Sequence, residues 1–241
     1  MQMERRKSQK RVVVFTGAGM SAESGVSTFR DADGLWENHR IEEVCTAEAW
    51  VRNPQMVLEF YNARRAQLDE VEPNAGHRAV AELERYFDSV TVVTQNVDDL
   101  HERAGSSRVV HLHGELRKAR SERDSELIVP APGPTHWGDR APDGAQLRPH
   151  IVFFGEAVPE YERALEIVRS ADLFLVVGTS LAVYPAAGLV YQLRPEVPVW
   201  LVDPRPARVE LPNPLTVVRT GAAEGVRTVV DEMVERCRID G

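Results

Sequence analysis

Residues 12–25 read VVVFTGAGMSAESG, an apolar run followed by a glycine-rich turn. The run is rich in Val and has no polar alternation, which is typical of a parallel strand buried on both faces. Gly17, Gly19 and Ala22 then satisfy the G-x-G-x-x-G/A pattern, in which the backbone approaches a pyrophosphate at a helix N-terminus. Small residues also follow first strands for packing alone, so the turn favours dinucleotide binding without establishing it.

Similar apolar runs recur along the chain and alternate with stretches of helical pattern. Strands are expected at 12–16, 90–94, 109–112, 151–154, 173–177, 197–202 and 215–218. Helices are expected at 54–70, 74–87, 159–170, 185–193 and 222–238. Asn53 and Asn74 are suitable N-caps for the first two helices. Strands that alternate with helices predict an α/β fold with a doubly wound parallel sheet.

The segment 117–149 interrupts this alternation. It is rich in charges and prolines and has little hydrophobic periodicity. Loops of this length are uncommon unless they are functional or mobile. The segment is therefore either a long surface loop or a small inserted module.

Composition limits the class of protein. The chain has 241 residues, with 37 acidic and 29 basic side chains and a net charge of −8, which argues against nucleic acid as the main partner. Its two cysteines, Cys45 and Cys237, cannot build a disulfide framework and suggest a reducing compartment. No apolar run is long enough to cross a membrane, and the charged N-terminus lacks the apolar core of a signal peptide. These features predict a soluble cytoplasmic protein without a membrane partner.

The stretch after the glycine turn does not continue as a dehydrogenase would. Such enzymes place an acidic residue at the end of a second strand, about 20 residues after the turn, to bind the ribose. Here the window 33–50 offers Glu37, Glu42 and Glu43, but no apolar strand precedes them. Ordinary hydride transfer is therefore disfavoured.

Polar residues follow two of the expected strands. Gln95, Asn96 and Asp98 come after the strand at 90–94, where α/β folds bind ligands. They suit ribose hydroxyls or a carboxamide, although Asn96 and Asp98 also suit the capping of the next helix. The next strand ends in HLHGEL, residues 111–116. His113, just before a glycine, is the better candidate for a general base near pH 7, with a structural histidine as the alternative.

Taken together, these pieces resemble the sirtuins, the NAD-dependent protein-lysine deacylases. The matching blocks are GAGMSAESGVSTFRDADGLW (17–36), TQNVDDLHERAG (94–105), HLHGEL (111–116), RPHIVFFGE (148–156), GTSLAVYPAAG (178–188) and LVDPRP (201–206). They cover almost the whole chain in family order. The resemblance implies one sirtuin-type domain, with a Rossmann-like NAD-binding part at about 8–30, 74–116 and 150–238. Small-module insertions are implied at about 31–73 and 117–149.

The resemblance also implies roles for individual residues. NAD, consumed as co-substrate, would contact Gly17, Ala18, Gly19, Ser21, Glu23, Phe29, Arg30, Trp36, Gln95, Asn96, Asp98, Gly178, Thr179, Ser180, Asp203 and Ala222 or Ala223. His113 would be the catalytic base, assisted by Asn96 and Asp98. An edge formed by Val152, Phe153, Phe154, Gly155 and Glu156 would pair with the acyl-lysine peptide by strand addition. The products would be nicotinamide, free lysine and O-acyl-ADP-ribose.

Tyr61 and Arg64 carry a further implication about the acyl group. They are spaced i, i+3 on one face of an expected helix and match the Y-x-x-R pair of class III sirtuins. In that class the pair binds the distal carboxylate of succinyl- or malonyl-lysine, because Arg offers a forked donor to a carboxylate. The resemblance thus implies desuccinylase and demalonylase activity, with deacetylation beside it.

One feature departs from the family pattern. Sirtuins usually carry four zinc-binding cysteines between the HGEL and FGE blocks, whereas 117–149 has none and Ser121 falls near the first expected cysteine. We therefore predict a module without metal, held by its prolines, Trp137 and local ion pairs.

Two other functions use the same residues. An NAD glycohydrolase or protein ADP-ribosyltransferase would use the same pocket, but would leave the peptide-pairing edge idle. A non-catalytic NAD-sensing module would be expected to have a damaged QN-x-D or HG block, and both are intact. The protein substrates and the oligomeric state stay open.

Overall fold

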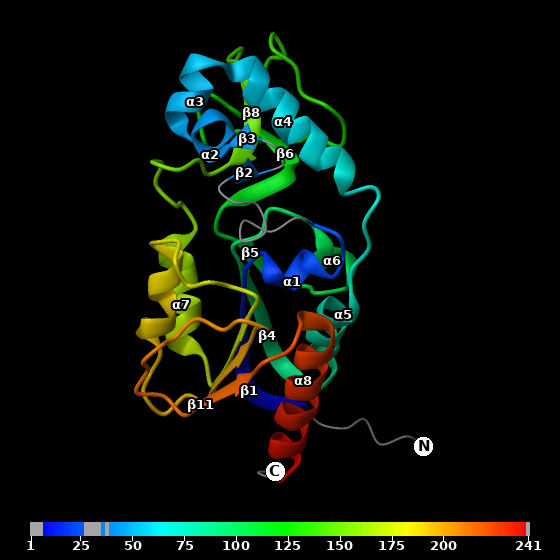
Figure 1. Cartoon of the computed structure of the whole chain (residues 1–241), viewed down its shortest axis with the longest axis vertical. Coiled ribbons are helices and arrows are strands. Elements are labelled where there is room, and N and C mark those ends of the chain that lie inside the picture. Colours follow the sequence, from blue (N-terminus) through cyan, green and yellow to red (C-terminus); the bar gives the residue numbers. More distant parts are fainter. Residues whose placement is uncertain (1–6, 27–34, 37–38, 240–241) are drawn as a thin grey trace.

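A six-stranded parallel sheet forms the larger part of the molecule (Figure 1). The computed structural model describes residues 7–26, 35–36 and 39–239, without the side chains of 35–36 and 237–239. The strand order is β11-β10-β9-β1-β4-β5. The chain therefore adds β4 and β5 on one side of the central strand β1, and then β9, β10 and β11 on its other side. The strands are β1 (Ser8–Thr16), β4 (Phe87–Thr94), β5 (Val109–His111), β9 (Leu173–Val177), β10 (Val199–Val202) and β11 (Leu215–Val218). This is the Rossmann-like doubly wound sheet expected from the sequence.

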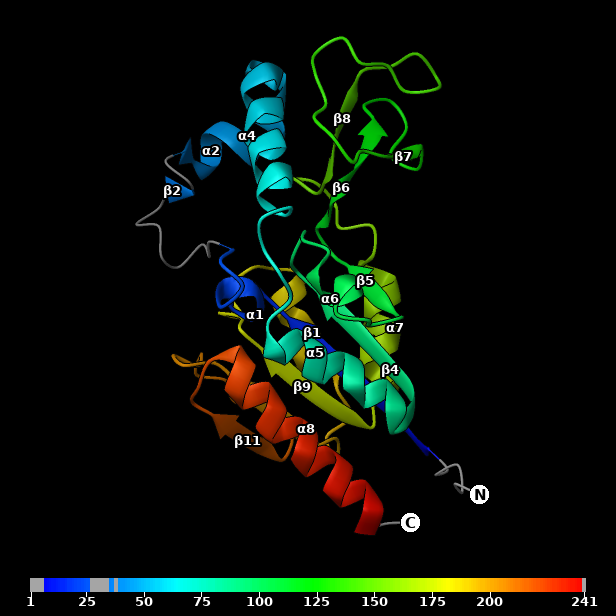
Figure 2. The ribbon, with the colours of Figure 1, turned by 90° about the vertical axis from the view of Figure 1, so that its right-hand side faces the viewer.

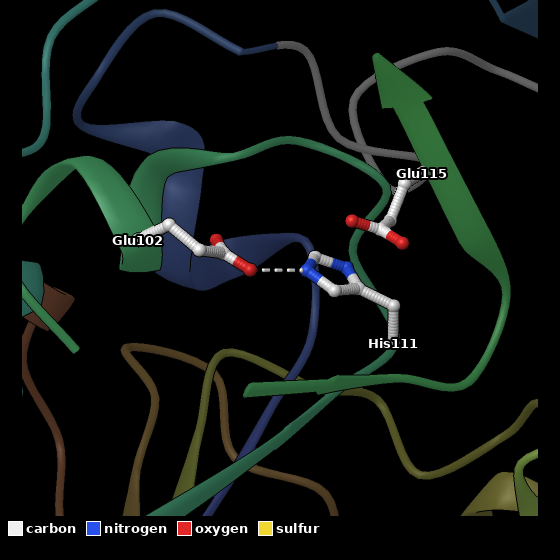
Figure 3. Close-up of side chains that lie close together, drawn as sticks. All are labelled: Glu102, His111 and Glu115. Carbon is white, nitrogen blue, oxygen red and sulfur yellow. Dashed lines mark hydrogen bonds and ion pairs between the residues drawn. The ribbon is translucent and has the colours of Figure 1, made fainter. Parts of the chain in front are cut away.

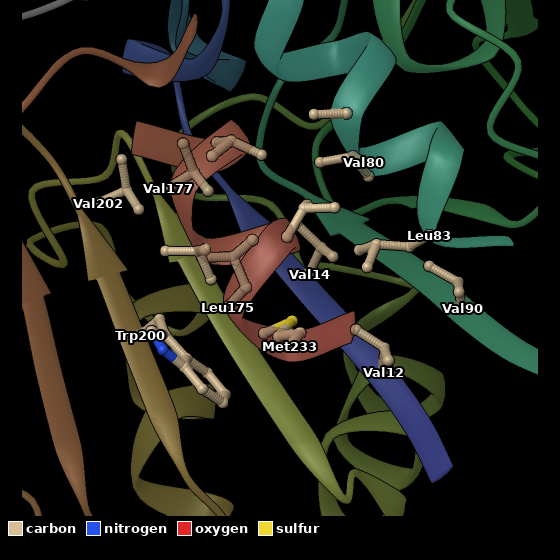
Figure 4. Packing of buried hydrophobic residues seen from close by; sticks show 14 of the residues in the cluster. Val12, Val14, Val80, Leu83, Val90, Leu175, Val177, Trp200, Val202 and Met233 are labelled. Atoms are coloured by element: carbon tan, nitrogen blue, oxygen red, sulfur yellow. The ribbon is translucent and has the colours of Figure 1, made fainter. Parts of the chain in front are cut away.

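Helices cover both faces of this sheet (Figure 2). On one face α5 (Ala75–Glu82) and α8 (Ala222–Ile239) enclose a core of Val, Leu, Met and Trp side chains (Figure 4). On the other face α7 (Tyr161–Ser170) and the 3₁₀ helix η3 (Ala186–Gln192) cover a second core. The central strand β1 is buried from Val12 to Thr16, as its unbroken apolar run predicts.

A small module stands beyond the carboxyl ends of these strands (Figure 1). It consists of the antiparallel sheet β7-β6-β8 and three helices that pack on it through a third apolar cluster. The elements are α2 (Ile41–Val44), α3 (Ala47–Arg52), α4 (Pro54–Gln67), β6 (Gly114–Ser121), β7 (Ile128–Pro130) and β8 (Leu147–Ile151). Short elements complete the chain: α1 (Gly19–Ala22), β2 (Leu35–Trp36), β3 (His39–Arg40), η2 (Leu83–Arg85) and α6 (Leu100–Arg103). The segment 117–149 is therefore part of a module and not a simple loop.

Local signals predicted the helix starts well and one strand badly. Asn53 and Asn74 cap their helices, because their side-chain oxygens accept backbone N–H groups of the first turn. The strand expected at 151–154 is wrong: only Ile151 belongs to a strand, β8 of the antiparallel sheet. An apolar run predicts that a segment is buried, but it does not predict which element covers the segment. Here the run packs against the helices of the small module.

Buried arginines hold the small module together. Arg65, 2% exposed, donates from Nε to the Leu116 carbonyl at 2.6 Å and from Nη1 to the Gly133 carbonyl at 3.1 Å. It thereby fixes α4 to both the strand β6 and the segment after β7. Arg148 forms a second link, because its guanidinium lies 4.1 Å from the centre of the Phe153 ring and pairs with Glu156.

The donors of this module do not fit a tetrahedral zinc site. The sequence has no cysteine between Cys45 and Cys237. The Ser121 hydroxyl donates to Asp143 at 2.7 Å and accepts the backbone N–H groups of Arg123 and Asp124, which makes a closed polar turn. Trp137 is 53% exposed, and its ring lies tilted beside that of Trp50, with the ring centres 6.5 Å apart. The absence of zinc stays a prediction.

Within the described residues, no helix combines the length and the apolar character that a membrane crossing requires.

Candidate active site

The candidate site lies where the strand order reverses, at the carboxyl ends of β1, β4, β5 and β9. Ligands of open parallel sheets bind at such switch points. The turn after β1 lies directly on the turn after β9, where the Gly19 N–H donates to the Gly178 carbonyl at 2.8 Å. Gly178 has φ +61°, and a Cβ there would lie 2.3 Å from the Met20 nitrogen. Close backbone packing thus accounts for these glycines, whatever ligand the turn binds.

Ser21 joins the first turn to the loop after β4. Its hydroxyl donates to the Asp98 carboxylate at 2.9 Å and accepts the Asn96 amide at 3.1 Å. The other Asp98 oxygen accepts the Leu100 N–H at 3.1 Å, so the local turn expected as an alternative is also present. Burial raises the pKa of the Asp98 carboxyl, while the Leu100 and Ser21 hydrogen bonds oppose the shift.

Two buried histidines pack beside this hydrogen-bond network. His77 lies 3.5 Å from the Ser21 hydroxyl, and burial lowers its pKa to about 4. His101 packs edge-on against His77 and contacts the Thr16 hydroxyl at 3.1 Å. Burial holds the pKa of His101 well below its ordinary value. Both rings are therefore neutral at pH 7.

His113 has the geometry of a general base. Its Nδ1 donates to the Gln95 carbonyl at 3.0 Å, which leaves the Nε2 lone pair for a reacting group. Burial lowers the pKa of His113, partly offset by this hydrogen bond, so the ring is neutral near pH 7. Gly114 has φ +87°, and a Cβ there would lie 2.0 Å from the His150 carbonyl oxygen. The turn that positions His113 therefore requires glycine.

One group of three side chains among the described residues is close enough to suggest a cation site. Ligand atoms of Glu102, His111 and Glu115 all lie within 4.8 Å of one another (Figure 3). His111 Nε2, however, already lies 2.8 Å from a Glu102 oxygen, and Lys118 Nζ lies 2.5 Å from Glu115. The charges of the group are thus matched by the protein, and we assign no metal to it.

The residues predicted for the adenosine half gather at the ends of β9 and β10. Thr179 accepts the Gln95 side-chain amide at 3.0 Å, which ties this half to the loop after β4. Asp203 is 2% exposed and accepts the Arg205 N–H at 2.8 Å. The Glu23 carboxylate accepts the Ala223 N–H at 2.8 Å, at the start of α8. Ala222 is buried beside it and Ser180 is exposed.

Tyr61 and Arg64 reach different depths of the small module. Tyr61 is 1% exposed and packs on Phe153, with ring centres 5.8 Å apart. Arg64 is half-buried, with its guanidinium 5.7 Å from the centre of the Phe60 ring. A small apolar cavity lies beside it, lined by Val26, Arg64, Gln67, Leu68, Val97, Asp98 and Leu116. Arg64 and Asp98 thus share one cavity, although they come from different parts of the fold.

The segment 152–156 is less open than an unpaired edge. The Phe154 N–H donates to the Cys45 carbonyl at 2.8 Å, and its carbonyl accepts the Ala47 N–H at 3.3 Å. The Val152 N–H donates to the His113 carbonyl. Glu156 faces inward, because its carboxylate accepts the Phe153 N–H at 2.9 Å and pairs with two arginines. Gly155 is exposed.

Several predicted site residues lie outside the described part of the chain, and some side chains that contact the site were not predicted. Phe29 and Arg30 are outside the described residues, as is the side chain of Trp36. The polar support from His77 and His101 was missed, as was the double contact of His111. The available signal was a histidine on the inward face of an otherwise apolar helix or strand, which requires a hydrogen-bond partner when buried.

Comparisons with known proteins identify relatives of this chain. The model of the Sir2 family matches residues 17–185. An NAD-dependent protein deacylase of Bacteroides thetaiotaomicron is 55% identical over 223 residues, which span 90% of this chain and 95% of that protein. One from Helicobacter pylori is 49% identical over 226 residues, spanning 94% and 98%. A solved Sir2 homolog–NAD complex has a TM-score of 0.81 at 37% identity, covering 96% of this chain and 90% of that chain. A structure of Sir2 bound to acetylated peptide has a TM-score of 0.74 at 27% identity, covering 92% and 93%.

Proposed function

The chain belongs to the Sir2 family, and on this premise we propose that it removes succinyl and malonyl groups from lysine in preference to acetyl groups. Its homology to curated relatives makes it an NAD-dependent protein deacylase, with NAD as the co-substrate. Acyl-lysine proteins or peptides are its second substrate. The preference for acidic acyl groups is the part that needs its own support.

The reacting end of the proposed site is the loop 95–98 together with His113. Asn96 and Asp98 would hold the nicotinamide-side ribose and the carboxamide of NAD. The neutral His113 Nε2 would take the proton of a ribose hydroxyl, which attacks the carbon of the transferred acyl group. Before this step the acyl carbonyl oxygen would bond to C1′ of that ribose as the bond from C1′ to nicotinamide breaks. After it, a water molecule would add as the lysine C–N bond breaks, so that lysine leaves and the acyl group ends on ADP-ribose. The observed Nδ1 contact of His113 supports this role, because it fixes the tautomer with a free Nε2 lone pair.

The acyl end of the proposed site is the cavity shared by Arg64 and Asp98. This shared cavity is the observation that carries the proposal, since a residue of α4, Arg64, and a residue of the loop 95–98, Asp98, line the same apolar space. Apolar walls suit the methylene groups of a succinyl chain. The guanidinium of Arg64 would suit its distal carboxylate, which acetyl-lysine lacks. Tyr61 is buried against Phe153, and it would help to position Arg64, which lies on the same face of helix α4.

Steady-state kinetics with one peptide carrying succinyl-, malonyl- or acetyl-lysine test the preference. Loss of charge-assisted hydrogen bonds in Arg64→Met should lower kcat/KM for the succinyl peptide roughly 100-fold, about 3 kcal/mol. The value for the acetyl peptide should change less than about threefold by the same reasoning. Arg85→Met, at an exposed arginine of η2, is the matched control. An equal loss for both peptides, or an unchanged succinyl rate, would reject the proposed preference.

A peptide-free assay separates the proposed reaction from the alternative. An NAD glycohydrolase or ADP-ribosyltransferase would release nicotinamide without an acylated peptide, whereas the deacylase requires one. His113→Ala should abolish acyl removal from all three peptides. Peptide-independent nicotinamide release at the rate seen with peptide would favour the alternative.

A further inference from the structure

His111 makes hydrogen bonds with both of its ring nitrogens at the end of β5. Figure 3 shows the one with Glu102 as a dashed line. Nδ1 lies 2.9 Å from the carbonyl oxygen of Asn96, and Nε2 lies 2.8 Å from a carboxylate oxygen of Glu102. The His111 side chain is 6% exposed, whereas that of Glu102 is 39% exposed. The two contacts connect the loop 95–98 to helix α6.

The partners of His111 decide its charge. A backbone carbonyl is only an acceptor, and an ionised carboxylate is only an acceptor. A neutral imidazole has one N–H, so one ring nitrogen would face an oxygen lone pair without a hydrogen between them. Only the imidazolium, with two N–H groups, satisfies both partners. His113 differs, because within the described part of the chain its one hydrogen-bond partner is a carbonyl.

The electrostatic surroundings agree with a charged ring. Burial alone would lower the pKa of His111, but the hydrogen bond and charge of Glu102 outweigh it and raise that pKa above its ordinary value. His111 in turn lowers the pKa of Glu102 overall, although burial opposes this. The titratable and charged groups that act on His111 are Glu102 and His101 on α6, Glu115 on β6, His150 on β8, and Asp98 in the loop, and Lys118 on β6 pairs with Glu115.

We propose that His111, as an imidazolium, is a positioning residue that holds the Asn96 peptide and thereby the NAD-binding loop 95–98. Asn96 is fixed by three groups: its N–H donates to Thr94 at 3.0 Å, its side chain donates to Ser21, and its carbonyl accepts from His111. Without His111 the Asn96 carbonyl has no hydrogen-bond partner among the residues that the structure describes, so the peptide is held less firmly. The proposal rests on the proposed function, in which this loop holds the nicotinamide-side ribose.

The two histidines of HLHG then have opposite charge requirements. Their Nδ1 atoms bind the carbonyls of adjacent residues, Gln95 for His113 and Asn96 for His111. His113 works as a neutral base, so acid inactivates it. His111 works as a cation, so alkali releases the loop. A bell-shaped pH profile of kcat/KM for NAD should result, with the alkaline limb set by His111.

Two substitutions separate this role from simple packing. His111→Gln offers one amide donor group and no charge, so it should raise KM for NAD about tenfold, with kcat changed less than about threefold, and should remove the alkaline limb. Glu102→Gln supplies an amide N–H that a neutral His111 Nε2 can accept, while Nδ1 still donates to Asn96. It should therefore keep the loop in place at all pH values and flatten the alkaline limb. Glu235→Gln, an exposed carboxylate of α8, is the matched control.

The ring protonation is measured directly by NMR on the whole unliganded protein with nitrogen-15-labelled histidine. We expect His111, assigned by its absence in His111→Gln, to carry protons on both ring nitrogens at pH 7, and His113 to carry one. Thermal unfolding confirms that each variant is folded. A neutral His111 at pH 7, or an alkaline limb unchanged in Glu102→Gln, overturns the proposal. Because NMR needs neither NAD nor peptide, a failure of the proposed deacylation is recognised separately, as a wild-type protein without activity.

Discussion

Replacing His77 by glutamine should remove a large part of the loss of stability that the protein shows at acidic pH. His77 is fully buried, and burial lowers its pKa from 6.5 to about 4. Its neutral ring accepts the Asn74 N–H at 3.3 Å and contacts the Ser21 hydroxyl. Protonation would replace the acceptor by a donor and place a charge in the interior beneath the candidate site.

The sign and size of the effect follow from proton linkage. The folded pKa is depressed, so the unfolded chain binds more protons between pH 6.5 and about 4. The contribution of His77 is thus fully present above pH 6.5 and is lost as pH falls toward 4. From pH 7.5 to pH 5 the loss is about 2 kcal/mol for this one residue.

Urea denaturation at pH 7.5 and pH 5 measures the prediction. His77→Gln should lose about 2 kcal/mol less than the wild type between the two pH values. A constant cost of the substitution cancels in this difference, because it appears at both pH values. His136→Gln is the matched control, since its ring is 69% exposed. If the wild type and His77→Gln lose the same free energy of unfolding on acidification, His77 is not held neutral by burial.

Three further outcomes are expected. Arg65→Met should lower the free energy of unfolding by about 3–5 kcal/mol in urea denaturation, because it leaves buried carbonyls unpaired. The exposed control Arg85→Met should change this free energy little. A small effect of Arg65→Met would contradict the role of Arg65 in joining α4 to β6 and to the segment after β7. Glu156→Gln should destabilise the protein at pH 7 by about 2 kcal/mol, because it removes the charge-assisted hydrogen bonds that the carboxylate accepts from Arg148. Burial opposes the effect of Arg148, but the pKa of Glu156 is lowered overall, so the difference should vanish as pH falls through that lowered pKa. Dialysis against EDTA should leave the Tm unchanged, and mass spectrometry that finds one zinc per chain would refute the metal-free module.

Much of the fold was predictable because it depends on local pattern. Unbroken Val-rich runs identified β1, β4 and β9, and Asn53 and Asn74 identified the starts of two helices. The segment 117–149 was ambiguous, because its strands are short and polar and are held by partners far away in sequence. The run at 151–154 was placed in the wrong sheet for the same reason: hydrophobicity predicts burial and does not identify the covering element.

The candidate site divides in the same way. The types and order of Gln95, Asn96, Asp98 and His113 were readable, since chemistry at strand ends requires those residue types. The family and its NAD chemistry followed from such blocks. The acyl preference and the missing zinc remain predictions that depend on residue identity at single positions.

The sequence by itself determined the parallel sheet, the glycine turns and the candidate base. Only the tertiary structure decided the charge states, because a pKa depends on burial and on neighbours brought from elsewhere in the chain. His111 and His113 are two residues apart and chemically identical, yet Glu102 beside one ring gives it a raised pKa, while burial with a single carbonyl lowers the pKa of the other. That contrast requires helix α6 and the loop 95–98 to fold against β5.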